Sequence, residues 1–324
     1  MSSNTMLIMG GVYQNLWKQP DLKLNCMLRV AGANVQITDL DIDFDIYKTN
    51  KKDPNKSTIT IWNLNDITYQ RILEKTYAVD LYIWYGDNEP TLAFRGYIEK
   101  DKTIQQGSPQ GRINTAKGFL ASTVKQDNRG GFDIPTTIEL VDARVAYTGK
   151  TINKNYRSAV SSTQIINDCI EAMGVGIAKF SNNIPEKIYK SGFNAIGKPH
   201  VILDNVCKSL NIRWNIANDL IQIIAPNEQF SGTYAVLLNP DNSERPAKNG
   251  ENEISITTRL LPFINPDDWV KAEFKEFQGT EQVKIVHSTG NNYGTAGTTA
   301  VIIGFDKEKK TKKRGRKKKN GKNL

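Results

Sequence analysis

Apolar and polar residues alternate along three stretches early in the chain, and each stretch predicts a half-buried β-strand. The first stretch is 22–30, the second is 40–46, and the third begins at residue 57. The third pattern stops at Asn65, a residue type that caps helices because its side chain accepts hydrogen bonds from the free amides of the first turn. This strand is therefore expected to end where a short helix begins.

Strand patterns continue after this short helix. Residues 79–85 and 91–100 each show strand patterns, and 86–90 supplies the turn between them. Strands, one short helix and further strands together predict an antiparallel β-barrel with a helical insertion. Three aromatic residues on the side opposite the predicted core indicate that a second surface packs there, and they are candidate interface residues: Trp62, Tyr82 and Trp84.

The pattern changes from about residue 126. Ser161 begins a capping-box pattern and Gly174 stands where a helix C-cap belongs, so a helix is expected between them. A second helix is expected around 200–210, followed by a hairpin over 212–224. This part of the chain is predicted to be an α+β middle domain.

Strands resume after a polar linker at 239–252. The fold class is therefore predicted to be mainly β with an α+β insert, that is, two β regions flanking a helix-containing middle domain. The predicted parts are an N-terminal β-barrel domain, the α+β middle domain, a C-terminal β-barrel domain and a basic tail: 1–125, 126–247, 248–305 and 306–324.

The net charge of +9 is concentrated at the C-terminus. Residues 307–324 hold 11 Lys/Arg and one Glu, which leaves a charge of −1 for the other 306 residues. The tail has no interleaved aromatic residue for base stacking. It is either a disordered, solubilising end or a polyanion-binding segment, for nucleic acid or an acidic protein surface. Its candidate binding residues are Lys309, Lys310, Lys312, Lys313, Arg314, Arg316, Lys317, Lys318 and Lys319.

Four aspartates at alternate positions form an acidic stripe: Asp39, Asp41, Asp43 and Asp45. A calcium loop of the EF-hand type also alternates acidic residues, but it needs Gly at its sixth position and Glu at its twelfth, and neither register supplies them. Carboxylates two residues apart on a strand lie about 7 Å apart and repel one another. The stripe is therefore expected to be a solvated strand face or a surface that meets a partner, and no metal is expected.

Several functional classes are not expected from the composition. The three cysteines are far apart, which fits neither a disulfide scaffold nor a zinc site and favours a reducing compartment. No apolar run approaches the ~20 residues of a membrane span, and the N-terminus lacks a signal-peptide pattern. His200 and His287 are the only histidines, and no nucleophile or metalloprotease motif accompanies them. We therefore expect no enzymatic activity and no cofactor.

Five segments carry features that occur together in one family. "STITIWNLNDITYQRI" (57–72) has a strand ending in W-N-L before a short helix, and "TLAFRGYIEK" (91–100) has an F-x-G-x-I pattern. Residues 203–224 are a helix followed by a hairpin, 259–274 contain "LLPFINPDDWV", and 281–291 contain "VKIVH". In this order they resemble the baseplate hub proteins of contractile-tailed phages, which share a fold with the hub domains of type VI secretion spikes. Asp267-Asp268 departs from the family pattern, where a Gly is common.

This resemblance implies a trimeric ring in which each subunit contributes two related, tube-like β-barrel domains. Such a ring is a pseudo-six-fold adaptor between the tail tube and the three-fold spike, with a channel for genome passage. It implies a homotrimer in the tail baseplate of a virion, assembled in the bacterial host cytoplasm. The implied partners are the tail tube or a tube-initiator protein, the spike, and tape-measure or baseplate wedge proteins.

We further hypothesise that the acidic stripe lines or neighbours the channel and that the tail contacts an acidic partner or the passing DNA. Two alternatives belong to other classes. One is a tail-tip cell-wall hydrolase, which would need paired carboxylates or a Cys/His site in a cleft. The other is a nucleic-acid-binding protein acting through its basic C-terminal tail.

Overall fold

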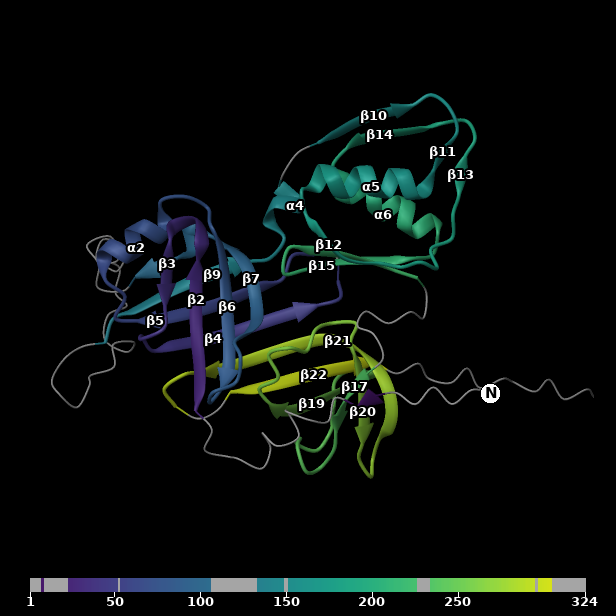
Figure 1. Ribbon diagram of the computed structural model, residues 1–324. Helices are drawn as coiled ribbons and strands as arrows, with labels where there is room; N and C mark the ends of the chain where they lie inside the picture. The colour runs from purple at the N-terminus through teal and green to yellow at the C-terminus, as the bar shows by residue number, and fades with distance from the viewer. Residues whose placement is uncertain are drawn as a thin grey trace, which may run out of the picture.

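The structure is a computed structural model, and it describes residues 7–8, 23–51, 53–105, 133–148, 151–225, 234–294 and 297–304. About 49% of it is strand and about 17% is helix, so the mainly β prediction is confirmed. The described residues form three hydrophobic cores, and we name the parts built on them the first, middle and third modules. Figure 1 shows the first and third modules joined, with the middle module beside them.

The first module is a set of strands with one short α-helix. Its elements are β2 (Leu24–Val30), η1 (Ala31–Ala33), β3 (Val35–Ile37), β4 (Ile42–Thr49), β5 (Lys56–Trp62), α2 (Asp66–Leu73), β6 (Ala78–Tyr85), β7 (Thr91–Ile98), η2 (Lys100–Lys102), β8 (Ile104–Gln105) and β9 (Pro135–Val141). Alternate residues of β5 are buried, including Ile59 and Ile61. Asn65 caps α2 as expected, because its side chain accepts from the Thr68 backbone N–H at 2.8 Å.

The middle module packs two helices against a three-stranded sheet and two smaller strand pairs. Its elements are α4 (Arg144–Thr148), β10 (Ile152–Tyr156), β11 (Val160–Ser161), α5 (Ser162–Met173), β12 (Gly176–Phe180), β13 (Ile188–Tyr189), β14 (Phe193–Gly197), α6 (Pro199–Ser209), β15 (Arg213–Ala217) and β16 (Leu220–Ile224). Ser161 caps α5, and Gly174 ends it with φ of 69°. Asn218 and Asp219 both have positive φ, as the tight turn of the β15–β16 hairpin requires.

The third module is built from strands alone among the described residues. Its elements are β1 (Leu7–Ile8), β17 (Tyr234–Leu238), β18 (Ala247–Lys248), β19 (Glu253–Arg259), β20 (Trp269–Glu273), β21 (Gln278–Asn291) and β22 (Thr298–Gly304). Its core includes β17 as well as the later strands, whereas β9 contributes Ile138 and Leu140 to the core of the first module. The domain boundaries proposed at 125/126 and 247/248 stay predictions.

The first and third modules share one sheet because β4 pairs with β21. Their antiparallel register runs from Asp43 opposite Asn291 to Thr49 opposite Ile285. The strand order is β1-β17-β20-β21-β4-β5-β9-β7-β6-β2-β3, with β22 and β19 branching from β21. The described strands do not form a closed barrel, because the edge of β4 that would close the first module is occupied by β21. The two expected barrels are thus an open, shared sheet.

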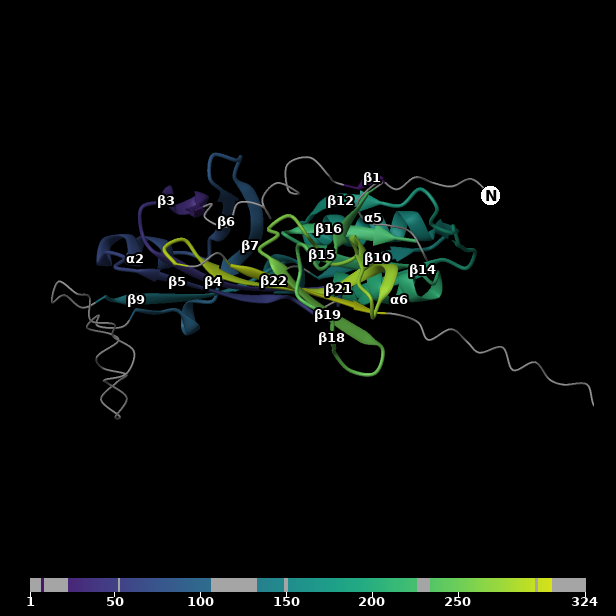
Figure 2. The ribbon, with the colours of Figure 1, turned by 90° about the horizontal axis from the view of Figure 1, so that it is seen from below.

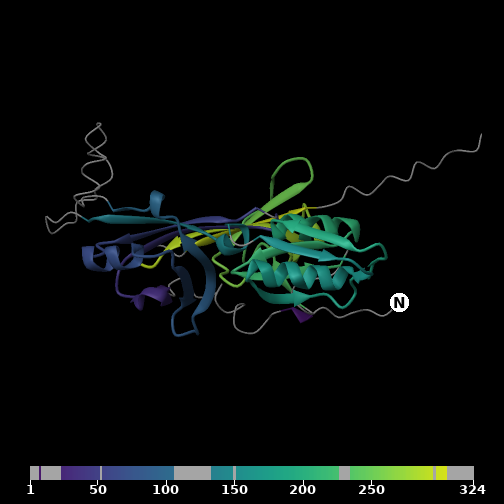
Figure 3. The same cartoon turned by 90° about the horizontal axis from the view of Figure 1, so that it is seen from above.

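This shared sheet has one buried and one polar side. Neighbouring strands β19, β22, β21, β4, β5 and β9 bury one set of alternate residues in the cores and leave most of the other set half-buried or exposed. We call the second set the polar face. Figure 2 shows these strands edge-on, with β3 and β6 on one side of the layer, and Figure 3 shows the layer from the opposite edge. The polar face is the opposite side of the layer.

Candidate partner interface

The acidic stripe lies along β4 and the segment before it, and its two β4 residues lie on the polar face. Asp43 and Asp45 belong to β4, and Asp39 and Asp41 lie in the segment just before it. The intervening apolar residues point into the core, as the period-2 pattern predicts, and they are buried: Ile42, Phe44 and Ile46. Asp39, Asp41 and Asp45 are exposed and Asp43 is half-buried. The stripe therefore presents its carboxylates to the outside of the molecule.

Three of the four carboxylates have side-chain hydrogen-bond partners, and Asp39 accepts from the Thr38 hydroxyl at 3.2 Å. Asp43 accepts from the Trp62 indole Nε1 and from the Tyr293 hydroxyl, each at 2.6 Å. His287 Nε2 lies 2.7 Å from Asp45 Oδ1. Burial and the adjacent Asp43 carboxylate raise the pKa of Tyr293, so its phenol stays protonated and donates at neutral pH. These bonds orient Asp43 and Asp45 without placing a lysine or arginine beside them.

The three aromatic candidates do not form one patch. Trp62 stands on the polar face of β5, whereas Tyr82 and Trp84 stand on β6. The intervening residues of both strands pack into the same core, so the two outer faces point away from each other. Tyr82 is engaged locally, because Arg29 donates to its hydroxyl at 2.7 Å and lies 5.1 Å from its ring centroid. A role for each residue at an interface stays a prediction.

Asp267 is a junction that sequence reasoning missed. It is 2% exposed and has φ of 67°, the left-handed conformation that favours Gly. Its carboxylate accepts from Arg213 Nη1 and Asn215 Nδ2 of the middle module, each at 2.8 Å. It also accepts from Asn50 Nδ2 of the first module at 3.3 Å. The sequence signal was an Asp pair, Asp267-Asp268, at a place where the resembled family commonly has Gly. This signal does not reveal that the Asp267 side chain joins all three modules.

Two further buried ionisable residues, Lys48 and Asp142, lie near the β4–β5 connection. Lys48 Nζ donates to Asn265 Oδ1 at 2.9 Å, and burial lowers the pKa of Lys48 to about 8. Asp142 accepts from the backbone N–H of Asn55 at 2.7 Å and from its side-chain amide at 2.8 Å. Burial raises the pKa of Asp142 to about 7 despite these bonds. Both groups are satisfied by neutral amides, as buried charged groups require.

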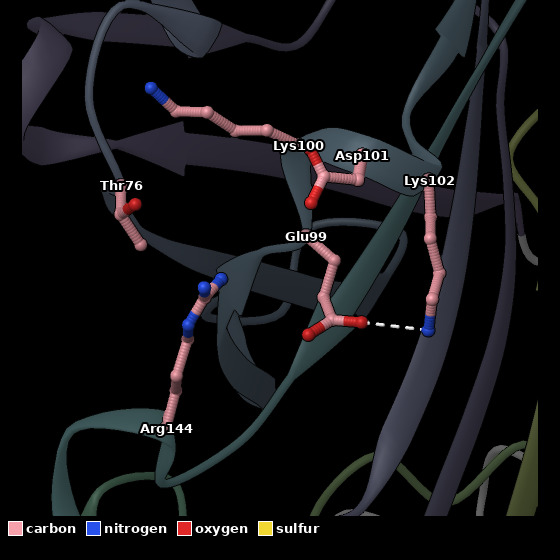
Figure 4. Close-up of a pocket in the computed structure, with 6 residues that line it drawn as sticks. All are labelled: Thr76, Glu99, Lys100, Asp101, Lys102 and Arg144. Atoms are coloured by element: carbon pink, nitrogen blue, oxygen red, sulfur yellow. Dashed lines mark ion pairs between the residues drawn. The ribbon is translucent and has the colours of Figure 1, made fainter. Parts of the chain in front are cut away.

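A small open pocket of about 190 Å³ lies where η2 meets α4. Figure 4 shows its lining residues: Thr76, Glu99, Lys100, Asp101, Lys102 and Arg144. Lys102 Nζ lies 2.8 Å from Glu99 Oε2 and holds the pKa of Glu99 below its usual value. Arg144 Nη1 donates to the backbone carbonyl of Ile98 at 3.2 Å. Glu99, Lys102 and Arg144 are thus used in structural contacts, and the lining also holds the carboxylate of Asp101 and the hydroxyl of Thr76.

The other sequence candidates have the following places. The basic tail candidates Lys309–Lys319 lie outside the described residues. His200 packs against Tyr147 with ring centroids 5.1 Å apart, and burial lowers its pKa. Within the described ranges, no group of three or more His, Cys, Asp or Glu side chains is arranged to hold a metal ion. No helix in the same ranges is long and apolar enough to cross a bilayer.

The chain matches no family model, and no curated protein matches it by sequence. Its structure is similar to the 43 kDa tail protein of prophage MuSo2 from Shewanella oneidensis, with a TM-score of 0.55 and 11% identity over 86% of this chain and 96% of that one. It is also similar to a tail protein from Neisseria meningitidis MC58, with a TM-score of 0.54 and 9% identity over 88% and 97%. The chain therefore shares its fold, over most of its length, with these two tail proteins.

Proposed function

We propose that this chain is a structural protein of a phage-type tail and, more finely, the central hub of its baseplate. The observation that carries the proposal is the β4–β21 pairing, which fuses two sheet modules of one chain into a continuous sheet with one polar face. Three such chains supply six sheet modules. A homotrimer can thereby match a six-fold tail tube at one end and a three-fold spike at the other, in the virion baseplate.

In this proposal the polar face lines the channel of the ring. Its side chains include the hydroxylated residues Thr58, Thr60, Thr137 and Thr289. The stripe carboxylates add negative charge, and duplex DNA carries one negative charge per ~1.7 Å of its axis. Repulsion over a Debye length of about 8 Å keeps phosphates off the wall at physiological ionic strength. Such a wall permits sliding because it offers DNA no binding site.

The same proposal assigns the contacts of the ring. Tyr82 and Trp84 lie on the side away from the polar face, where a neighbouring subunit or a tail partner would bury them. The partners are the tail tube or a tube-initiator protein and the spike, with tape-measure or wedge proteins as further contacts. The role is structural and requires no catalytic site. Similarity in fold to two tail proteins supports a tail component but carries no partner with it.

Oligomeric state tests the hub proposal directly. Light scattering of the purified full chain, alone and with a co-expressed spike protein, is expected to give a species of about 109 kDa for the hub, three times the 36.3 kDa chain. Electron microscopy of that species is expected to show a ring with a central channel. A protein that stays monomeric under both conditions would contradict the hub role.

A nucleic-acid-binding role through the tail is the second candidate, and the excess of 11 Lys/Arg over one Glu in residues 307–324 favours it. It predicts duplex binding whose affinity falls steeply with salt and is lost when 306–324 are removed. Retained binding after this deletion would assign the DNA contact to the modules instead.

A further inference from the structure

The middle module faces the shared sheet with one side of the β15–β16 hairpin. Figure 1 shows β15 at the edge of the middle module that lies next to the shared sheet. The other side of the hairpin packs into the core of the middle module, and that core shares no residue with the two other cores. The side toward the shared sheet consists of Arg213, Asn215, Ala217, Leu220, Gln222 and Ile224. Ile224 is the one large apolar side chain among these six that is buried, so apolar burial contributes little to this contact.

The first strand of the hairpin is tied to the third module. Arg213 Nη1 and Asn215 Nδ2 each donate to the Asp267 carboxylate at 2.8 Å. Arg213 Nη2 also donates to Gln282 Oε1 of β21 at 3.3 Å. These polar bonds hold the start of β15 against the shared sheet.

The turn of the hairpin is tied to the first module and to the point where the chain enters the middle module. The Arg95 backbone N–H of β7 donates to Asn218 Oδ1 at 2.9 Å. The Asp219 carboxylate accepts from the Tyr97 hydroxyl of β7 and from the Ala143 backbone N–H. Since β9 pairs with β7 at the last two residues of β7, the turn contacts the edge of β7 just before that pairing begins.

The hairpin also buries acceptors that receive no hydrogen bond. Among the described residues, seven buried side-chain nitrogen or oxygen atoms have no hydrogen-bond partner, and three belong to this hairpin: Asn215 Oδ1, Asp219 Oδ1 and Gln222 Oε1. Asn215 and Gln222 are opposite each other in the register and are 3% and 2% exposed. A buried acceptor without a donor costs free energy that hydration returns. Exposure of these oxygens to water therefore favours separation of the hairpin from the sheet.

The chain enters the middle module through Asp142 and Ala143, between β9 and α4. Asp142 is anchored to the first module, because it accepts from the Asn55 backbone N–H at 2.7 Å. Ala143 has φ of 51°, the left-handed conformation that is unfavourable for a residue with a Cβ, and its N–H donates to Asp219 in the hairpin turn. Loss of that bond allows the Ala143 backbone to relax to a negative φ, which reorients the module that follows. The return connection to β17, 226–233, lies outside the described residues.

We propose that the middle module is a hinged arm that swings away from the shared sheet about Ala143 while its own core stays folded. The β15–β16 hairpin is the latch that keeps the arm closed. Its polar bonds favour the closed form, whereas its buried acceptors without donors and the left-handed hinge residue favour the open form. The two forms therefore exchange reversibly under native conditions. The arm does not depend on the hub role, because all of its parts belong to one chain.

Amide hydrogen exchange of the full chain measures the opening, because the latch contains its own reporters. The amides of Arg95 and Ala143 are both bonded to the hairpin turn. As references, the Trp62 amide donates to Asp41 O within the first module, and the α5 amides are bonded within their helix. We expect the two latch amides to exchange with one common opening constant, at least about tenfold larger than that of the references. Exchange of latch and reference amides at one common opening constant would mean that the arm opens only when the protein unfolds, and would overturn the proposal.

The variant Asp219→Gly separates the latch from the stability of the module. It removes the bonds to Tyr97 and Ala143, but it creates an Asn-Gly turn, which is favoured where both turn residues have positive φ. We therefore expect the opening constant to rise about tenfold while exchange in α5 stays the same or slows. Asp241→Gly, the same change at an exposed position of the third module, is the matched control and should alter neither. No change at Arg95, or an equal acceleration at Arg95 and in α5, would contradict the latch.

Distances between spin labels separate movement of the whole arm from fraying of the hairpin turn. Labels at Gln70→Cys in α2 and Asn167→Cys in α5 report on the first module against the arm. Labels at Asn167→Cys and Asn205→Cys in α6 report within the arm, and all three positions are exposed whereas the native cysteines are buried. We expect Asp219→Gly to populate a second distance for the first pair and to leave the second pair unchanged. An unchanged distance for both pairs, together with faster exchange at Arg95, would assign the exchange to fraying and overturn the hinged arm.

Discussion

Asp267 offers the sharpest test of how the three modules are held together. Its buried carboxylate accepts hydrogen bonds from Arg213 and Asn215 of the middle module and from Asn50 of the first module. Asp267→Asn keeps the size and tolerates the left-handed backbone, but it removes the charge and turns one acceptor into a donor. Breaking a buried ion pair from one side costs about 3–5 kcal/mol. Since the Arg213 side chain is 43% exposed and can be solvated, we expect a loss of about 2 kcal/mol in the free energy of unfolding.

Two further variants at this position separate the carboxylate from the backbone. Asp267→Ala and Asp267→Gly both remove every side-chain bond, but Ala must also adopt φ of 67°. That conformation costs a residue with a Cβ about 1 kcal/mol relative to Gly. Asp267→Gly is therefore expected to be the more stable of the two by about this amount, although both are less stable than the parent.

Urea unfolding followed by tryptophan fluorescence gives these free energies, and Trp214 in β15 reports on the middle module. Because modules can unfold separately, amide hydrogen exchange of residues 213–217 should be measured alongside. We expect this exchange to accelerate in all three variants. Asp87→Asn, an exposed substitution, is the control. If Asp267→Ala unfolds within about 0.5 kcal/mol of the parent and exchange at 213–217 is unchanged, the junction does not hold the modules as described.

Three further predictions concern the modules separately. Ser161→Ala removes the α5 cap, in which the Ser161 hydroxyl accepts from Gln164 N at 3.1 Å, and it should lower the free energy of unfolding in urea by about 1 kcal/mol. The control Ser158→Ala, at an exposed position, should change this free energy by less than about 0.5 kcal/mol. Burial raises the pKa of Asp142 to about 7, so the folded protein keeps a proton that the unfolded chain loses near pH 4. The stability that this site contributes is full below about pH 4 and is lost as the pH rises through 7. Asp142→Asn should flatten this pH dependence of the free energy of unfolding, measured by urea titrations at a series of fixed pH values. Gly290→Ala places a Cβ 2.7 Å from Gly297 Cα and should lower the melting temperature by several degrees. Gly174→Ser has open space around its Cβ but φ of 69°, and it should lower the melting temperature less. Equal shifts would show that β21 and the segment before β22 do not approach closely at Gly290.

Local rules predicted the parts of the fold that depend on a few neighbouring residues. The alternation around Ile59 and the caps at Asn65, Ser161 and Gly174 required only side-chain periodicity and the chemistry of free helix amides. The β4–β21 pairing could not be predicted in this way, because it joins Asp43 to Asn291 across almost the whole chain. Its register depends on the packing of two cores. For the same reason the strand patterns suggested one β-barrel and the family resemblance a second, where the described strands form a shared open sheet.

The candidate site shows the same division. The period-2 pattern was sufficient to place the carboxylates of Asp43 and Asp45 outside the core. Their partners could not be inferred, because Tyr293 and His287 come from the third module and reach β4 only through the shared sheet. The separation of Trp62 from Tyr82 was also not predictable, since each strand alone shows only an outward aromatic residue. Which outward faces coincide is decided by how the sheet bends around its core.

The joint between the modules and the acidic stripe are one structural unit. Tyr293 and His287 bind Asp43 and Asp45 across the joint, and Asn292 extends it, accepting from Ile42 N at 2.8 Å and donating to Leu40 O at 2.9 Å. A slip of β4 against β21 by one residue would turn the stripe toward the core, where unpaired carboxylates are prohibitively costly. The stripe therefore opposes misregister of the joint, and the joint in turn orients the stripe. A partner that binds the stripe acts on the strand pair that connects the two sheet modules, which is the feature on which the proposed hub role depends.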